Sequence, residues 1–278
     1  MSNRCAIVTL NVGRRFSGNF KQYFMPGWQE YCRNHKLDLV HLETLLDQSP
    51  RALARSPAWQ KLIIHTAKEV RGYDRLAWVD ADVVIRPDAP NIFEVVESGR
   101  IGAVDDFATP TRDDHDLVME ELYRGWDRDG IRYARNRTPA EYYANYGIRC
   151  DLNSVVQTGV MVYEPEVHGS IFQRVYQNYE EAAECSLNHE MRPLSYELLS
   201  AGLVQWINPK FNMQWSYYRG LHYSFLDAPE RFRLIRWLNI SAYGAVLASC
   251  AQNAYSRNYF LHFAGGSKDY HHITPFKS

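Results

Sequence analysis

Short apolar segments alternate with helix-like segments through the first third of the chain. Strand character is strongest in Cys5–Val12, Leu37–Leu42 and Arg75–Val79, where Ile, Val, Leu and Ala predominate. Between them, Asn19–Asn34 and Pro57–Val70 place their large apolar residues at helical intervals. The succession strand, helix, strand, helix, strand predicts a parallel sheet with crossover helices, which is the rhythm of an α/β fold.

Local signals refine this prediction. Pro57 suits the first turn of a helix, where a missing N–H costs nothing, whereas the pair Pro26-Gly27 predicts a break in the preceding helix. Beyond residue 100 the same patterns predict further strands at Ile101–Val104, Val155–Tyr163, Leu203–Ile207 and Tyr259–Phe263, and helices at Val167–Glu184 and Pro193–Ala201.

Two stretches depart from this alternation. Residues 109–150 are charged and aromatic with few aliphatic side chains, so we expect an insertion of loops and short helices there. Residues 212–236 are aromatic-rich, and we expect irregular structure. Because no repeat or Gly/Ser linker divides the chain, a single domain over residues 1–278 with two insertions is favoured over two domains.

Charge and cysteine usage limit the classes of partner. The 31 Lys and Arg nearly balance the 32 Asp and Glu, which argues against a protein-wide polyanion surface, and no nucleic-acid partner is expected. The 5 cysteines are widely spaced without a CxxC pair, so neither a zinc site nor a disulfide framework is indicated. A reducing, cytoplasmic compartment fits this pattern best.

Membrane signals are weak. The N-terminus lacks the apolar core of a signal peptide. The longest mildly apolar stretch, residues 242–251, is far shorter than the ~20 residues that a span requires. We expect no integral membrane segment, which leaves peripheral membrane association open.

The sharpest chemical signal is the sequence Asp80-Ala81-Asp82, directly after the apolar strand Arg75–Val79. Ligands of open α/β sheets bind at the carboxyl ends of strands. Hard cations such as Mg²⁺ and Mn²⁺ prefer carboxylate oxygens, and two adjacent carboxylates are costly without a cation. We therefore predict a divalent metal site at Asp80 and Asp82; the alternative is a turn in which one Asp caps and the other is solvated.

A second signal lies near the C-terminus, where His262 ends a strand-like segment and is followed by Gly265, Gly266 and Lys268. Imidazole is a common metal ligand. Glycines let successive backbone N–H groups cradle a phosphate, and lysine supplies a point charge for it. The combination predicts a third metal ligand next to a phosphate-binding turn.

Taken together, these motifs resemble the GT-A fold nucleotide-sugar glycosyltransferases, especially the retaining galactosyl, glucosyl and mannosyl types. Gln157-Thr-Gly-Val160 resembles the strand that lines the sugar site, with Gln157 in place of the usual Asn. Glu190-Met191 resembles a helix start in which Met191 replaces the usual Gln. Further matching stretches are Thr9–Gly13, Trp59–Leu62, Tyr73–Asp82 and Pro209–Asn212.

The resemblance implies a GT-A (Rossmann-like) mixed, mainly parallel sheet flanked by helices, with acceptor-side insertions. It implies that residues 5–108 bind the nucleotide sugar and that 109–150 are an insertion. Residues 151–278 would bind the acceptor and close over the donor. The implied activity is transfer of a sugar from a nucleoside diphosphate sugar, with UDP as the commonest base, to an acceptor hydroxyl with retention of configuration.

The resemblance also implies a role for each candidate residue. Mn²⁺ or Mg²⁺ would be held by Asp80, Asp82 and His262, while Gln157 and Glu190 would stabilise the oxocarbenium-like centre. The residues implied to bind the donor are Thr9, Asn11, Gly13, Lys61, Asp80, Asp105, Asp106, Gly265, Gly266 and Lys268. The implied acceptor is a glycan, a lipid-linked glycan or a small molecule, in polysaccharide biosynthesis by analogy.

Some assignments stay open at this point. Aromatic residues of the second insertion are candidates for an acceptor platform, because sugars pack their C–H faces on rings; these are Trp215, Tyr217, Tyr218, Tyr223 and Trp237. One rival activity is a haloacid-dehalogenase-type phosphatase with Asp80 as nucleophile. Another is a non-catalytic nucleotide- or carbohydrate-binding protein on the same fold, which the departure at Met191 favours.

Overall fold

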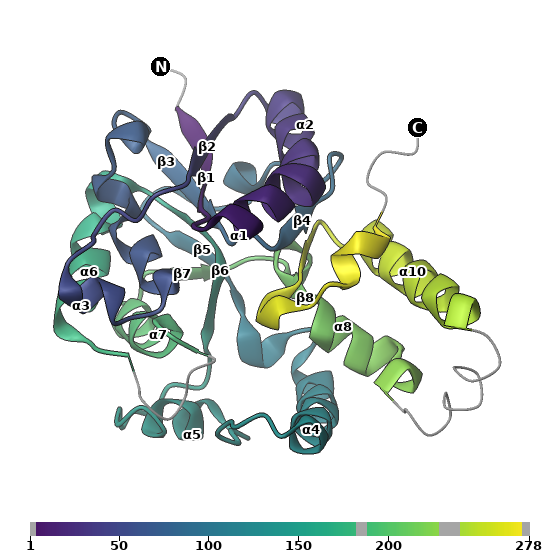
Figure 1. Ribbon diagram of the computed structural model, residues 1–278. Coiled ribbons are helices and arrows are strands. Elements are labelled where there is room, and N and C mark those ends of the chain that lie inside the picture. The colour runs from purple at the N-terminus through teal and green to yellow at the C-terminus, as the bar shows by residue number, and fades with distance from the viewer. Residues whose placement is uncertain (1–3, 182–187, 228–239, 274–278) are drawn as a thin grey trace.

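A six-stranded mixed sheet forms the centre of the protein, with strand order β2-β1-β3-β6-β5-β7 (Figure 1). The structure is a computed structural model that describes residues 4–181, 188–227 and 240–273. β6 pairs antiparallel with β3 and β5, whereas the other neighbouring pairs are parallel. Five strands therefore run one way, which confirms the mainly parallel sheet. The strands are β1 (Cys5–Leu10), β2 (Asp38–Leu42), β3 (Arg75–Val79), β5 (Ile101–Asp105), β6 (Val156–Tyr163) and β7 (Val204–Trp206).

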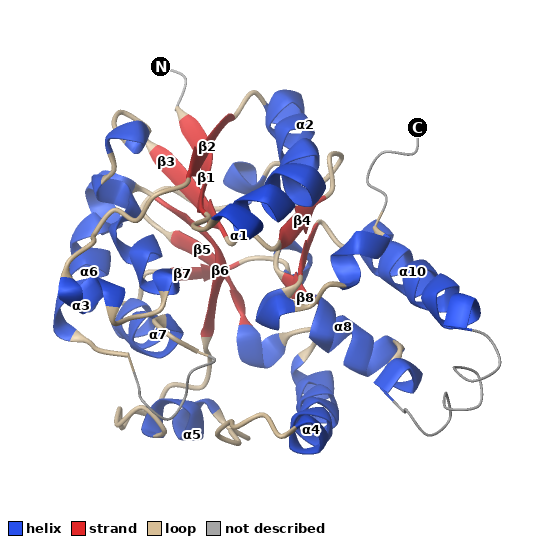
Figure 2. Ribbon diagram, viewed as in Figure 1, coloured by secondary structure: helices blue, strands red, loops and turns tan. Residues whose placement is uncertain are grey.

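Helices cover both faces of this sheet (Figure 2). Because side chains alternate along a strand, Leu76 and Trp78 of β3 pack into one apolar layer and Ala77 and Val79 into the other. The first layer is completed by the segment Pro57–Thr66, α6 (Pro165–Asn178) and α7 (Met191–Ser200). The second contains α2 (Met25–His35), the π-helical segment Phe20–Phe24 and α10 (Ile240–Arg257).

A second, three-stranded sheet lies beside the first and is built from distant parts of the chain. Its order is β4 (Val83–Ile85), β9 (Phe260–His262) and β8 (Met213–Gln214). β4 and β9 are antiparallel with Val83 opposite His262, whereas β8 and β9 are parallel with Gln214 opposite His262. This small sheet places the end of β9 next to the turn that follows β3.

The insertion 109–150 differs from its prediction. It contains α4 (Arg112–Asp129), which has 18 residues, and α5 (Pro139–Ala144). α4 begins at Thr111, whose side chain accepts a hydrogen bond from the N–H of Asp114, and ends at Gly130 in the left-handed conformation. The prediction of short helices alone was wrong, because these capping residues support a long helix whose buried residues, His115, Val118 and Tyr123, include only one aliphatic side chain.

Other helix predictions also need correction. Pro57–Val70 is two 3₁₀ segments, Pro57–Thr66 and Lys68–Val70, rather than one α-helix. Its residues 59–64 are all buried, so packing on several sides rather than local propensity sets the winding. The break expected at Pro26 is absent, because Pro26 lies in the first turn of α2. The irregularity comes before it, where the π-helical segment Phe20–Phe24 joins α1 (Arg14–Asn19) to α2.

The last third of the chain holds more regular structure than its composition predicts. β8 and α8 (Trp215–His222) lie where irregular structure was expected, and α10 was not predicted. α6 ends at Asn178, and the predicted helix end at Glu184 lies outside the described residues, as does Trp237. Within the described ranges, no helix combines the length and apolarity needed to cross a bilayer.

Candidate metal and donor site

Asp80, Asp82 and His262 converge at the carboxyl end of β3. One ligand atom from each lies within 4.8 Å of those of the other two. The Nε2 atom of His262 is 3.1 Å from Oδ1 of Asp82 and 3.9 Å from Oδ2 of Asp80. A tight turn, in which the N–H of Val83 donates to the carbonyl of Asp80, brings both carboxylates round to β9. The three residues predicted as metal ligands are thus brought together.

The orientation of the His262 ring follows from a chain of hydrogen bonds. The N–H of Gly159 donates to Oε1 of Gln157 (2.6 Å), which also accepts from Nδ2 of Asn212 (2.9 Å). Oδ1 of Asn212 therefore points to Nδ1 of His262, 3.0 Å away, and accepts its proton. This directs Nε2 at the two carboxylates, which is how a metal-binding histidine is oriented by its outer partner.

The charges around this histidine also favour a cation. Burial by itself would lower the pKa of His262, but the carboxylates of Asp82 and Asp80 outweigh it, and the pKa of His262 is raised. Burial acts to raise the pKa of Asp82, and the positive His262 outweighs it, so that pKa is lowered. The proton on His262 thus supplies the positive charge that the two carboxylates favour. A divalent cation could supply it instead, because carboxylate oxygens and an imidazole nitrogen are suitable ligands.

Lys61 joins this centre to the predicted catalytic carboxylate. Its buried Nζ lies 3.0 Å from Oδ1 of Asp80 and 2.9 Å from Oε1 of Glu190. Both carboxylates keep the ammonium form, so the pKa of Lys61 is raised even though burial acts to lower it. Glu190 also accepts from the hydroxyl of Thr158 at 2.8 Å, and Asp80 accepts from the indole N–H of Trp78 at 2.7 Å. Lys61 therefore fixes two carboxylates that face the same space.

The residues predicted to bind the nucleoside lie at the carboxyl end of β1. Thr9 and Asn11 are buried, and neither Oγ1 of Thr9 nor Oδ1 of Asn11 has a hydrogen-bond partner in the described part of the chain. Such buried polar atoms normally have one. Gly13 follows with φ 102°, a conformation that favours glycine, and α1 starts directly after it. These orphaned oxygens are consistent with a polar ligand at this end of the strand.

The predicted phosphate-binding turn follows β9. Gly265 and Gly266 lie in the short turn Ala264–Gly266, where Gly265 has φ 76°, and Lys268 is exposed. The next residue, Asp269, anchors the segment: its Oδ2 accepts from Nε1 of Trp215 (2.7 Å) and pairs with Arg219 (3.2 Å). The segment that follows β9 is thus anchored at Asp269, while Gly265 and Lys268 are exposed.

The adjacent acids Asp105 and Asp106 have different surroundings. Asp105 accepts from the N–H groups of Phe107 and Val155 and pairs with Arg112 at 3.1 Å, so its side chain holds the local backbone. Asp106 accepts from Gln214 at 3.0 Å and from the Tyr217 hydroxyl at 3.3 Å. Burial, assisted by the charge of Asp105, raises the pKa of Asp106 to about 7.

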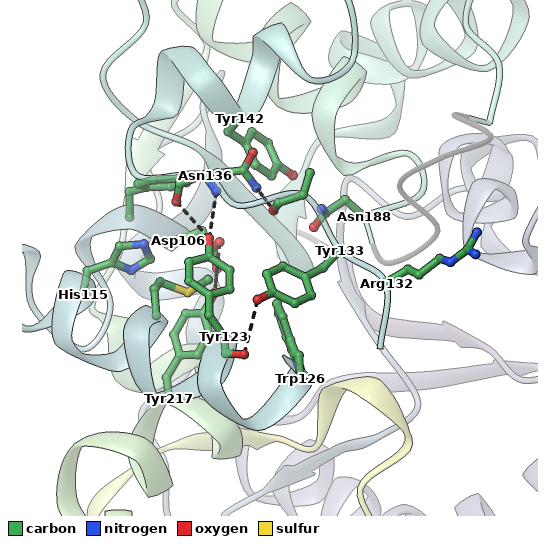
Figure 3. Close-up of a pocket in the computed structure, with 13 residues that line it drawn as sticks. Asp106, His115, Tyr123, Trp126, Arg132, Tyr133, Asn136, Tyr142, Asn188 and Tyr217 are labelled. Carbon is green, nitrogen blue, oxygen red and sulfur yellow. Dashed lines mark hydrogen bonds between the residues drawn. The ribbon is translucent and has the colours of Figure 1, made fainter. Parts of the chain in front are cut away.

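The predicted aromatic platform is largely interior. Trp215, Tyr217 and Tyr218 are buried, and Tyr223 is partly buried against the main core. Their rings contribute to packing and, through Trp215 and Tyr217, hold Asp269 and Asp106. The exposed part of the aromatic surface lies elsewhere, in the insertion 109–150, where Figure 3 shows rings around a cavity next to Asp106.

Sequence reasoning missed the residues that orient the ligands. Asn212 was noted as part of the stretch Pro209–Asn212 but given no role, and Gln214 and Thr158 were not singled out. Their partners His262, Asp106 and Glu190 lie 50, 108 and 32 positions away in the sequence.

Comparisons with known proteins place this site on a recognised fold. No protein-family model matches the chain, and no curated protein sequence matches it. Solved structures do match. A glycosyltransferase involved in the glycosylation of the major capsid of PBCV-1 has a TM-score of 0.51 and 13% identity, covering 96% of this chain and 98% of that one.

Two further solved structures agree. The bifunctional glycosyltransferase WbbM has a TM-score of 0.55 and 14% identity over 96% of this chain, which spans only 47% of WbbM. The galactosyltransferase LgtC, solved with donor and acceptor sugar analogues, has a TM-score of 0.50 and 13% identity, covering 97% of this chain and 92% of LgtC. The resemblance to GT-A glycosyltransferases is thereby confirmed at the level of the fold.

Proposed function

We propose that this protein is a metal-dependent glycosyltransferase that moves a sugar from a nucleoside diphosphate sugar, a UDP-sugar by our reading, to an acceptor hydroxyl. The observation that carries the proposal is the geometry of His262, whose Nε2 is turned by Asn212 toward Asp80 and Asp82. This donor set stands at the carboxyl end of β3 on a fold shared with solved glycosyltransferases.

The division of the chain follows from this site. We assign residues 5–108 to the nucleotide sugar, with Thr9, Asn11 and Gly13 at the nucleoside. Residues 109–150 are the insertion, and residues 151–278 supply the acceptor side and the segment that closes on the donor. Gly265, Gly266 and Lys268 of that segment face the diphosphate, and Asp105 and Asp106 lie beside the donor sugar.

The residues act on a diphosphate leaving group. Mn²⁺ or Mg²⁺, when bound by Asp80, Asp82 and His262, supplies positive charge for the two phosphates. Lys268 and the amides of Gly265 and Gly266 add donors for the same oxygens. If one such donor is worth ~3 kcal/mol, Lys268→Ala lowers the rate on the order of 10²-fold. Lys61 keeps Asp80 in place and compensates its charge.

Retention of configuration suits the remaining groups. The bond from the anomeric carbon to the leaving phosphate breaks as the acceptor oxygen bonds on the same face, and the phosphate takes the acceptor proton. Glu190 and Gln157 stabilise the positive anomeric carbon, and Lys61 and Thr158 hold Glu190 in position. No strong base beside the acceptor hydroxyl is required for this route.

The alternatives receive less support. The matching solved structures are glycosyltransferases, which favours glycosyl transfer over the phosphatase. Among the described residues, Cys32, Cys150 and Cys250 are free thiols, which supports a cytoplasmic site of action. We place the reaction in the assembly of a polysaccharide or lipid-linked glycan by analogy with the fold. The non-catalytic alternative differs from our proposal in predicting ligand binding without turnover.

Thermal unfolding with UDP or GDP, with and without Mn²⁺, tests the site directly. At ~100 times its dissociation constant, a ligand stabilises the fold by ~2.7 kcal/mol. We expect a shift that requires both nucleotide and metal, is absent in Asp82→Ala and is intact in the exposed control Asp113→Ala. No shift with either nucleotide contradicts the donor site. A shift without turnover of any UDP- or GDP-sugar supports the non-catalytic alternative instead.

A further inference from the structure

A cavity of about 70 Å³ lies between the insertion 109–150 and Asp106. Most of its lining comes from α4, α5 and the chain between them, and Phe107, Asn188 and Tyr217 complete it. Figure 3 shows these side chains around one space, with Arg132 extending away at its edge. The insertion therefore builds a concave surface rather than only covering the sheet.

The walls of this cavity are aromatic. The rings of Tyr123 and Tyr133 stack with centroids 5.0 Å apart and planes 7° apart, and Trp126 lies 5.0 Å from Tyr133. Tyr133 and Trp126 are partly exposed, so their rings remain accessible. Flat rings of this kind pack against the C–H faces of sugar rings, which bury apolar surface without hydrogen bonds.

The inner end of the cavity is polar, and charges of both signs lie near it. Asp106 lines it, and the guanidinium of the buried Arg192 lies 4.7 Å from the centroid of the Tyr142 ring. The described partners of Asp106 there are the neutral side chains of Gln214 and Tyr217. The hydroxyl of Tyr142 is buried with no hydrogen-bond partner in the described residues. Carboxyl, amide and phenol groups hydrogen-bond to hydroxyl groups, and Asp106, where it is ionised, would repel a ligand carboxylate. This chemistry favours a hydroxyl-rich ligand without a carboxylate beside Asp106.

The cavity adjoins the donor site. Gln214, which holds Asp106, is the register partner of His262 between β8 and β9. The charge of His262 reaches Asp106 and acts to lower its pKa. On the other side, Asn188 lines the cavity two residues before Glu190. A ligand held here therefore meets the proposed reaction centre at its inner end.

The size of the cavity limits its ligand. Its 70 Å³ is about half the ~150 Å³ of an engineered cavity that binds benzene. Only one face or edge of a sugar ring can therefore enter it. The rest of that ring, and any further sugar of a glycan, would have to lie outside, past Arg132.

We propose that the cavity lined by Asp106, Tyr123, Trp126, Tyr133 and Tyr142 binds the terminal neutral pyranose of a glycan acceptor. The sugar packs one face on the aromatic wall and directs hydroxyl groups to Asp106, so that one hydroxyl reaches the donor sugar. This inference rests on the proposed function and adds to it the acceptor class and the segment of the chain that selects it.

Ligand-observed NMR with simple glycosides tests this assignment. Methyl α- and β-glycosides of glucose, galactose and mannose are the probes, each with UDP and Mg²⁺ present and absent. Methyl glucuronoside and phenol serve as anionic and purely aromatic comparisons. The variants are Tyr133→Ala, which removes part of the wall, and Tyr133→Phe, which keeps the ring. Leu117→Ala is the matched control, because Leu117 is an exposed residue of the same helix.

We expect at least one neutral methyl glycoside to bind the wild type, Tyr133→Phe and Leu117→Ala, and to bind Tyr133→Ala about tenfold more weakly. The UDP shift in thermal unfolding should be equal in all four proteins. Binding by none of the neutral glycosides, binding only of glucuronoside or phenol, or unchanged binding in Tyr133→Ala would overturn the assignment. If UDP or GDP binds and the glycosides do not, the acceptor assignment fails alone; if neither nucleotide binds, the proposed function fails.

Discussion

The Nδ1 atom of His262 lies 3.0 Å from Oδ1 of Asn212, and both side chains are buried. The contact fixes which imidazole nitrogen carries a proton and leaves the other one facing Asp80 and Asp82. The metal affinity of the proposed site should therefore depend on Asn212, although Asn212 is not itself a proposed ligand and acts through the ring of His262.

Replacing Asn212 by alanine should weaken Mn²⁺ binding by about 10–100-fold, the usual effect of losing the outer partner of a ligating histidine. Calorimetric titration with Mn²⁺ measures it directly. Asn153→Ala, at an exposed position, should bind as the wild type does. Equal Mn²⁺ affinity in Asn212→Ala would mean that His262 is not a ligand.

Substitution of Gly159 by alanine should also disrupt the site. A Cβ atom there would lie 2.5 Å from Cε1 of His262 and 3.0 Å from Oε1 of Gln157, so the ring must move. We expect a loss of about 1–3 kcal/mol in unfolding free energy and a lower Mn²⁺ affinity. As a control, Gly125→Ala on α4 meets only the end of Arg128 at 3.8 Å and should be tolerated. Unchanged Mn²⁺ binding in Gly159→Ala would contradict the described ring position.

Lys61→Met should destabilise the protein strongly, because it leaves the carboxylates of Asp80 and Glu190 without their shared cation. The loss of one partner from a buried ion pair costs about 3–5 kcal/mol, which for a chain of 278 residues corresponds to a fall in Tm of roughly 5–9 °C. The exposed control Lys68→Met should change Tm little. Adding Glu190→Gln to Lys61→Met should recover part of the loss; a double variant no more stable than the single one would argue against this account.

Asp106 should make stability depend on pH. Its pKa rises from 3.8 to about 7 on folding, so the folded state holds a proton that the unfolded state has released. The stabilisation that this proton gives the folded state is complete below about pH 4 and decreases as the pH rises from about 4 to 7. Above about pH 7 it is absent. The change is at most about 4 kcal/mol, because each pKa unit is worth about 1.4 kcal/mol. The difference in unfolding free energy between wild type and Asp106→Asn, measured over this range, should show that slope; a flat difference would rule it out.

Asp269→Ala should loosen the segment that carries Lys268, because Trp215 and Arg219 lose their common acceptor. The loss of hydrogen bonds worth about 1 kcal/mol corresponds to roughly fivefold weaker UDP binding in the presence of Mn²⁺. The affinity for Mn²⁺ alone should stay unchanged, since the three ligands are elsewhere. Equal weakening of both would show that Asp269 supports the metal site instead.

The strands β1, β2 and β3 were predictable because each carries its apolar pattern locally. Arg75–Val79 is the same segment in the prediction and in the structure. The long helix of the insertion could not be predicted in this way, because the buried residues of α4 are His115, Val118 and Tyr123, which give no aliphatic periodicity. Its helical character lies in Thr111 and Gly130, which mark its ends.

The candidate site was likewise only partly predictable from the sequence. Asp80, Asp82 and His262 could be named from sequence because each ends an apolar segment in a residue type suited to metals. The contacts of Asn212, Gln214 and Lys61 could not, because they depend on pairings between strands and segments far apart in the chain. Gln214 belongs to a strand of two residues, too short for periodicity to be detected.

The pairing of β4 with β9 has a consequence for when the proposed metal site can form during synthesis of the chain. Val83 lies opposite His262, so two ligands of the proposed metal site follow β3 while the third arrives 180 positions later in synthesis. A chain emerging from the ribosome can form β1 and β3 and expose Asp80 and Asp82 long before His262 exists. On our proposal, the chain can bind the cation at this site only after residue 262 has been synthesised and β9 has paired with β4.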